Sequence, residues 1–263
     1  MRRSKLELAT VVVLATLLIA GAACLLAMPQ REVVVARFAT SLRGRSSAQI
    51  HNARLATEAI DGTVVRPGRV FSFNKTVGLW QAETGYRRAP VSYDGELVLA
   101  WGGGVCQVST ALYNAALLAG TEILERSRHS WAPSYVAPGR DAAVASGGID
   151  LRFRNTLPWP IRIRGKVAGE SLMFEMLARE PLPWRVQVTA NVDAVRAPCQ
   201  VLQLDPALPP GRRRVVTEGQ PGFRACVYRT FLPPGGPPRR QLVSADSYPP
   251  LNRVVHVGPE RPG

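Results

Sequence analysis

Residues 101–110 read Trp101-Gly102-Gly103-Gly104-Val105-Cys106-Gln107-Val108-Ser109-Thr110, and they place a glycine hinge directly before the expected start of a helix. Glycine reaches backbone angles that side chains forbid, so this run allows a sharp turn. Apolar residues then recur at helical spacing from Val108 to Ala119, and Gly120 supplies a C-terminal stop. We therefore predict a helix that begins at about Cys106 and ends before Gly120.

Strand patterns surround this helix on both sides. Alternating apolar and polar residues are typical of strands with one buried face. A second helix is expected around residues 50–60, and Asp94-Gly95 indicates a hairpin turn. The expected strands lie at residues 33–40, 63–65, 71–74, 149–153, 159–167 and 172–177. The fold class is therefore predicted to be α+β, with a mainly antiparallel sheet and a few helices, followed by a small all-β module.

The chain divides at Pro181-Leu182-Pro183, where helical periodicity ends and short strands broken by Pro/Gly turns begin. We expect three parts. These are residues 1–30, an N-terminal segment; residues 31–181, the α+β domain; and residues 182–263, the all-β module.

The N-terminal segment has the features of a membrane anchor. Arg2, Arg3 and Lys5 precede an apolar run from Leu8 to Met28 that is long enough to cross a bilayer. The basic end is expected to stay in the cytoplasm, which places the remainder outside it. A cleaved signal peptide is the alternative, since Ala20-Gly21-Ala22 offers small residues for cleavage.

The net charge of +14 comes almost entirely from arginine. Outside the cytoplasm, the available polyanions are wall polymers and anionic lipids, and no aromatic interleaving indicates base stacking, so nucleic acid is not an expected partner. Scattered arginines are equally explained by a GC-rich genome. The histidines show no paired ligand spacing, there is no Cys-x-x-Cys, and Gly102-Gly103-Gly104 lacks the lysine of a phosphate loop. We therefore expect no metal and no cofactor.

Cys106 is the candidate nucleophile. The positive end of a helix favours the thiolate, which is the reactive form of cysteine. His129 follows the same helix and is the candidate base, while Glu125, Asp141 or Asp150 would orient its imidazole. The alternative is that Cys106 is a small buried residue that packs beneath the helix.

Cys199 and Cys226 flank a segment of alternating strand character in the β module. Because an extracytoplasmic compartment tolerates disulfides, we predict that these two cysteines are joined and that Cys106 is the odd thiol.

Several ordered motifs resemble those of VanW-like proteins over about residues 36–180. They are Thr63-Val64-Val65-Arg66-Pro67-Gly68, Phe71-Ser72-Phe73-Asn74, Gly85-Tyr86, Gly102 through Thr110, Leu112-Tyr113-Asn114-Ala115, Glu125 through Ser130, and Asp150 through Asn155. Residues 182–260 resemble the glycine-rich G5 module, through Glu218-Gly219-Gln220-Pro221-Gly222 and Val254 through Gly258. The resemblance implies a bacterial cell-envelope protein that contacts peptidoglycan or the cell wall, and it assigns no catalytic role.

Two classes of function remain open. In the first, the protein binds the wall, and Trp80, Trp101 and Trp131 stack on sugar rings unless they pack in the core. In the second, Cys106 and His129 form a peptidoglycan amidase or transpeptidase, in which Gln107 and the amides near Gly103 and Gly104 stabilise the oxyanion.

Overall fold

The computed structural model describes residues 32–93 and 96–260 of the 263-residue chain. The predicted membrane segment, about residues 8–28, lies outside this range. Within the range, no helix is both long enough and apolar enough to cross a membrane. Residues Val33–Gly263 form one compact unit.

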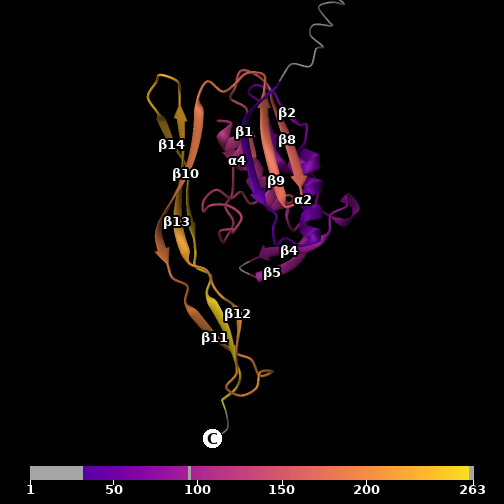
Figure 1. Cartoon of the computed structure of the whole chain (residues 1–263). Coiled ribbons are helices and arrows are strands. Elements are labelled where there is room, and N and C mark those ends of the chain that lie inside the picture. Colours follow the sequence, from indigo (N-terminus) through magenta and orange to yellow (C-terminus); the bar gives the residue numbers. More distant parts are fainter. Residues whose placement is uncertain (1–31, 94–95, 261–263) are drawn as a thin grey trace, which may run out of the picture. The chain divides into compact units, whose positions relative to one another are not determined.

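The first half of this unit is built on a four-stranded antiparallel sheet in the order β1-β9-β8-β2. The helices α2 (Ser47–Ile60) and α4 (Val105–Leu118) pack against this sheet, α2 on β8 and α4 on β1 and β9 (Figure 1). The strands are β1 (Val33–Ser41), β2 (Val64–Val65), β8 (Ile161–Ala168) and β9 (Ser171–Ala178).

The two faces of the sheet differ in chemistry along β9. Leu172, Phe174 and Met176 are fully buried beneath the helices. Glu175 points the other way and pairs with Arg37 of β1 and Arg164 of β8. This alternation is the signature of a sheet that buries one face against helices.

Both helices begin where local sequence requires it. Ser46 caps α2 with a capping box, in which Ser46 Oγ accepts from the Gln49 N–H and the Gln49 side chain accepts from the Ser46 N–H. Helix α4 starts after Gly104, whose φ of 105° is in the left-handed region that favours glycine. From Val105 to Leu117 every residue of α4 except Cys106 is buried, so α4 is the central helix of the core.

Smaller elements complete this half. The strands β4 (Arg88–Tyr93) and β5 (Glu96–Trp101) pair antiparallel on either side of residues 94–95, where the hairpin turn was predicted. A three-stranded sheet has the order β3-β7-β6. Its strands are β3 (Val70–Ser72), β6 (Glu122–Glu125) and β7 (Arg152–Arg154), and the short helices are α3 (Phe73–Val77) and η1 (Ala82–Thr84).

The second half, after Pro183, contains only strands among its described residues. One sheet has the order β10-β13-β14 and is antiparallel; the other has the order β11-β15-β12, in which β11 and β15 run parallel. The strands are β10 (Arg185–Arg196), β11 (Gln200–Leu204), β12 (Arg213–Thr217), β13 (Gly222–Leu232), β14 (Arg239–Tyr248) and β15 (Arg253–Val257). The predicted fold class, α+β followed by an all-β module, is confirmed.

The predicted disulfide is wrong. Cys199 and Cys226, like Cys106, are free thiols. Cys226 lies in the middle of β13, opposite Asn191 of β10, whereas Cys199 directly precedes β11 in the other sheet. Alternation identified the strands around these cysteines but not the sheets to which they belong.

Candidate functional site

Cys106 is the second residue of α4, and the glycines before it lie in tight surroundings. A Cβ at Gly104 would lie 2.4 Å from the Gln49 carbonyl oxygen, and one at Gly103 would lie 2.8 Å from Ala89 Cβ. A Cβ at Gly102 would lie 2.9 Å from the indole of Trp80. The glycine run is therefore required because the backbone passes directly against neighbouring residues on its way into α4.

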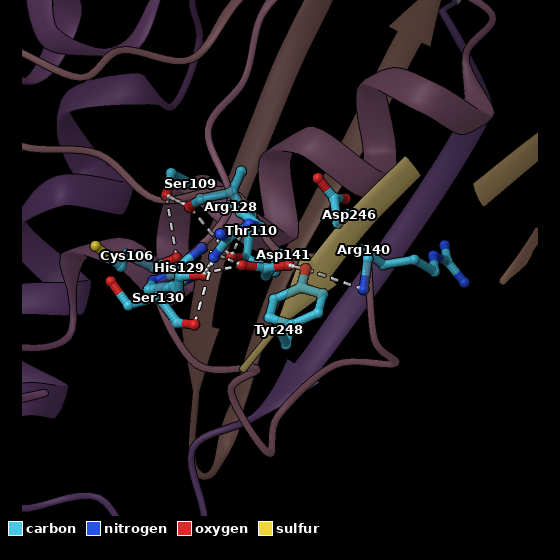
Figure 2. A network of polar contacts seen from close by, with 12 residues as sticks. Cys106, Ser109, Thr110, Arg128, His129, Ser130, Arg140, Asp141, Asp246 and Tyr248 are labelled. Carbon is cyan, nitrogen blue, oxygen red and sulfur yellow. Dashed lines mark hydrogen bonds and ion pairs between the residues drawn. The ribbon is translucent and has the colours of Figure 1, made fainter. Parts of the chain in front are cut away.

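His129 lies beside Cys106 because the chain after β6 folds back along residues 141–143. An isolated bridge pairs Ser127 with Ala143, and the Ala143 N–H donates to the Ser127 carbonyl (2.8 Å). Asp141 Oδ2 accepts from both the backbone N–H and Nδ1 of His129, each at 2.7 Å. Figure 2 shows the imidazole between Cys106 and the Asp141 carboxylate.

The ionisation of this group follows from its contacts. Burial raises the pKa of the Cys106 thiol, but a hydrogen bond with His129 and the His129 charge outweigh it, so the pKa is lowered. Burial lowers the pKa of His129, whereas its hydrogen bonds with Asp141 and Cys106 raise it, to about 9. The two shifts, a lowered Cys106 pKa and a raised His129 pKa, both favour the thiolate–imidazolium form of the pair.

Asp141 is fully buried and remains ionised. Burial raises its pKa, but the hydrogen bond from His129 and the charge of Arg126 lower it to about 2. Its second oxygen, Oδ1, accepts from Arg126 Nη2 (3.0 Å) and from the Tyr248 hydroxyl (2.5 Å). Every proton donor around this carboxylate stabilises its charge, so Asp141 is well suited to orient His129.

Two residues of strand β14 hold this network and were not predicted. Tyr248 reaches Asp141 from 107 residues away in sequence, and Asp246 Oδ2 accepts from Arg126 Nη1 (2.6 Å). Figure 2 shows both side chains on the Asp141 side of the imidazole. No sequence signal pointed to them, because their role depends on how the β module packs on the α+β domain.

A cavity of about 450 Å³ opens beside Cys106 and His129. Its walls include predicted binding residues, namely Gly103, Gly104, Gln107 and Trp131, together with Arg45 and Tyr135. Gln220 and Leu251 of the β module also line it. Trp101 lies in β5, is 44% exposed, and is not among the residues that line the cavity.

The remaining predicted residues lie elsewhere. Glu125 is in β6 beside Arg152, at 3.6 Å, and does not contact His129. Asp150 accepts from Ser72 Oγ (2.6 Å) and the Asn74 N–H (2.9 Å), so it fixes the start of α3. Trp80 packs edge-on against Phe73.

The Gln107 side chain is fully engaged within the protein. Its Nε2 donates to Thr40 Oγ1 (3.1 Å) and the Ser41 carbonyl (2.8 Å), and its Oε1 accepts from Arg45 Nε (3.1 Å). We expected the Gln107 side chain to donate to an oxyanion. Its amide is not free to do so, because both hydrogen bonds of Nε2 are made within the protein. The Cys106 backbone N–H is the remaining candidate donor. The N–H groups of Val105 and Gln107 donate to the carbonyls of Gly102 and Gly104, whereas no acceptor for the Cys106 N–H is seen among the described residues.

Cys106, His129 and Asp141 follow one another in space in the order that a nucleophile, a base and an orienting carboxylate would take. Within the described part of the chain, no group of three His, Cys, Asp or Glu side chains is placed to hold a metal ion.

Comparison with known proteins assigns both halves of the chain to families. Residues 48–177 match the family described as VanW like protein, and residues 189–260 match the G5 domain. The chain is 40% identical over 151 residues to the uncharacterized protein YoaR of Bacillus subtilis (strain 168), covering 57% of this chain and 50% of that protein. It is 29% identical over 136 residues to the vancomycin B-type resistance protein VanW of Enterococcus faecalis (strain ATCC 700802 / V583), covering 49% of each.

The chain therefore spans about half the length of these curated relatives. Among solved structures, it is similar to the G5 domain of HP0197, with 20% identity, a TM-score of 0.17, and coverage of 28% of this chain and 97% of that one. It is also similar to the G5 domain of IgA1 protease, with 23% identity, a TM-score of 0.22, and coverage of 30% and 94%. The chain thus carries a VanW-like domain at residues 48–177 and a G5 domain at residues 189–260.

Proposed function

We propose that this protein is an extracytoplasmic cell-envelope enzyme that performs acyl transfer on peptide amides of the cell wall, with Cys106 as nucleophile. The observation that carries the proposal is the Cys106–His129–Asp141 arrangement beside an open cavity. His129 is 21% exposed and Asp141 is fully buried, so the reactive end of the group faces the cavity and its orienting end faces the core.

The reaction follows from the ionisation states. The Cys106 thiolate attacks the amide carbonyl carbon, and the new C–S bond places negative charge on the carbonyl oxygen, within reach of the Cys106 backbone N–H. His129 Nε2 gives its proton to the amide nitrogen, the C–N bond breaks, and an amine leaves. Water or a second amine then attacks the thioester and gives a proton to His129, and the thiolate is released.

Asp141 makes both proton transfers possible. Its bond to Nδ1 leaves Nε2 free for the thiol and the leaving amine, and its charge stabilises the imidazolium. Hydrolysis and transpeptidation differ only in the second nucleophile, so the same residues serve both.

The extracytoplasmic location is supported by two observations. The N-terminal sequence has the pattern of a membrane anchor or signal segment. One relative is named as a vancomycin resistance protein. We propose residues 31–181 and 182–263 as the two domains, both outside the membrane. Protease added to intact protoplasts should then digest the chain beyond Arg31, and full protection would contradict this topology.

Mass spectrometry of the purified protein incubated with peptidoglycan fragments tests the chemistry. A thioester at Cys106 is expected, and it should be absent in Cys106→Ala. Cys199→Ala is the matched control, because Cys199 is a free, exposed thiol away from the site. If Cys106→Ala modifies wall fragments as fast as the unaltered protein, the nucleophile hypothesis fails.

A wall-binding role for the G5 domain is the second candidate. It is favoured by the family match, and the resemblance implies contact with wall glycans. The Cys106→Ala protein should then still co-sediment with isolated walls. High salt separates specific binding from attraction by arginine charge, since exposed charges are screened by salt.

A further inference from the structure

The cavity beside Cys106 is lined by one arginine, Arg45, that has no carboxylate partner among the residues that the structure describes. Among the residues that line it, none is Asp or Glu, and Arg45 is the only Arg or Lys. The other basic side chain of the lining, His129, is paired with Asp141 through Nδ1, at 2.7 Å. A ligand in this cavity therefore meets a guanidinium that has no carboxylate partner among the described residues.

Arg45 is held in place by fixed neighbours. Its Nε donates to Gln107 Oε1 (3.1 Å), and its guanidinium lies 5.2 Å from the centre of the Tyr135 ring. Gln107 is itself fixed through Thr40 and Ser41. Burial keeps the pKa of Tyr135 above its ordinary value, so this ring carries no negative charge to neutralise the arginine.

The end of the guanidinium remains free for a ligand. The two Nη atoms of Arg45 have no carboxylate partner in the described part of the chain. Arg126 is a useful contrast, because its Nη atoms bond to Asp141 and Asp246. A planar guanidinium with two free nitrogens matches a carboxylate in size and geometry.

Arg45 and the Cys106 thiol line the same cavity. Gln107, which binds Arg45, directly follows Cys106 in α4, and Tyr135 lines the same cavity as the thiol. An anion bound by Arg45 would thus lie in the same cavity as the amide that Cys106 attacks.

We propose that Arg45 binds a carboxylate of the substrate, so that the preferred substrate is a peptide with a free carboxylate close to the amide attacked by Cys106. The claim that this carboxylate belongs to a substrate rests on the acyl transfer proposed above. The carboxylate site itself can be tested without any turnover.

Alkylation with two reagents measures the site directly. Iodoacetate carries a carboxylate and iodoacetamide does not, while both alkylate thiolates. In the full chain, peptide mass spectrometry gives the ratio of the two rates at Cys106 and at the exposed Cys199, which serves as an internal reference. The iodoacetate preference at Cys106 should exceed that at Cys199 by about tenfold, as one charge-assisted hydrogen bond allows.

Variants then assign the preference to Arg45. Arg45→Gln should lower the iodoacetate preference at Cys106 by about tenfold and leave the iodoacetamide rate nearly unchanged. Arg45→Lys should give an intermediate iodoacetate preference, because lysine keeps the positive charge but lacks the planar pair of donor nitrogens. Arg43→Gln, at an exposed position outside the cavity, removes the same charge and should have no effect. An unchanged ratio in Arg45→Gln overturns the proposal.

A binding measurement covers the case in which Cys106 is unreactive. Calorimetry with the Cys106→Ala protein compares N-acetylalanine with its amide. The acid should bind more tightly, and Arg45→Gln should remove the difference. If acid and amide bind equally, the carboxylate site is refuted; if the acid is preferred but no thioester forms with wall fragments, only the acyl-transfer proposal fails.

Discussion

Tyr248→Phe isolates the contribution of the β module to the candidate site. The Tyr248 hydroxyl donates to Asp141 Oδ1 (2.5 Å) and accepts from the Gly139 N–H (3.2 Å), and Tyr248 is 2% exposed. Phenylalanine keeps the ring and its contact with Phe223 but removes both hydrogen bonds.

The expected loss of stability follows from these two bonds. A hydrogen bond to a charged group contributes roughly 1.5–3 kcal/mol, and a buried N–H left without a partner costs roughly 1–3 kcal/mol. The free energy of unfolding should therefore fall by about 3 kcal/mol, which lowers the melting temperature by about 6–12 °C for a domain of this size. Asp141 keeps Arg126 and His129 as donors, so the fold should persist.

The assay is thermal unfolding combined with the rate of Cys106 alkylation as a function of pH. We expect slower alkylation near neutral pH, because a less constrained Asp141 holds His129 less firmly. Tyr228→Phe on β13 is the matched control: its ring contacts Arg240, and no hydrogen bond of its hydroxyl is seen among the described residues. If Tyr248→Phe melts at the same temperature as Tyr228→Phe and alkylates at the unaltered rate, the view that β14 supports the site is wrong.

Three further predictions concern the candidate site and the glycine run that leads into α4. His129→Gln should raise the pKa of Cys106 and slow its alkylation at pH 7 by about tenfold or more, since each pKa unit changes the thiolate fraction about tenfold; an unchanged pH–rate profile would contradict the pair. The contribution of His129 to the free energy of unfolding should be fully present below its unfolded-state pKa of 6.5 and lost as pH rises through its folded-state pKa of about 9. The contribution of Asp141 should be present above its unfolded-state pKa of 3.8 and lost as pH falls through its folded-state pKa of about 2. Unfolding midpoints measured across this pH range test both. Gly104→Ala should cost roughly 2–5 kcal/mol in denaturant unfolding, because it combines a left-handed backbone with overpacking against Gln49. Gly62→Ala, with a φ of 77° and nothing within 4 Å of its added Cβ, should cost only the backbone part, about 1–2 kcal/mol, and equal losses would refute the packing argument.

Much of the first half could be predicted from local pattern. The helical spacing after Cys106 and the glycines before it correspond to α4, and the alternation along residues 159–177 corresponds to β8 and β9. These patterns are informative because each residue in a helix or strand meets the core at a period set by the backbone itself. The placement of Cys106 at the start of α4 follows from the same local geometry.

The partner of His129 could not be chosen from sequence. Glu125, Asp141 and Asp150 were equivalent candidates, and only the path of the chain selected Asp141, since the Ser127–Ala143 bridge brings it against the imidazole. The engagement of Gln107 with Arg45 was hidden for the same reason, because side-chain partners depend on where separate segments meet.

The sequence by itself determined the helices α2 and α4 and most of the strands, that the chain is α+β followed by all-β, and that a cysteine lies at the start of a helix after a glycine turn. It missed β6, and Phe73 and Asn74, which were expected to end a strand, begin helix α3 instead, because Ser72 caps that helix through the Lys75 N–H. Only the tertiary structure decided that Cys199 and Cys226 lie in different sheets and that Tyr248 and Asp246 of β14 support Asp141 and Arg126. The physical reason is that periodicity records how each residue meets the core through its own backbone, whereas contacts between segments a hundred residues apart depend on packing between surfaces that no local repeat encodes.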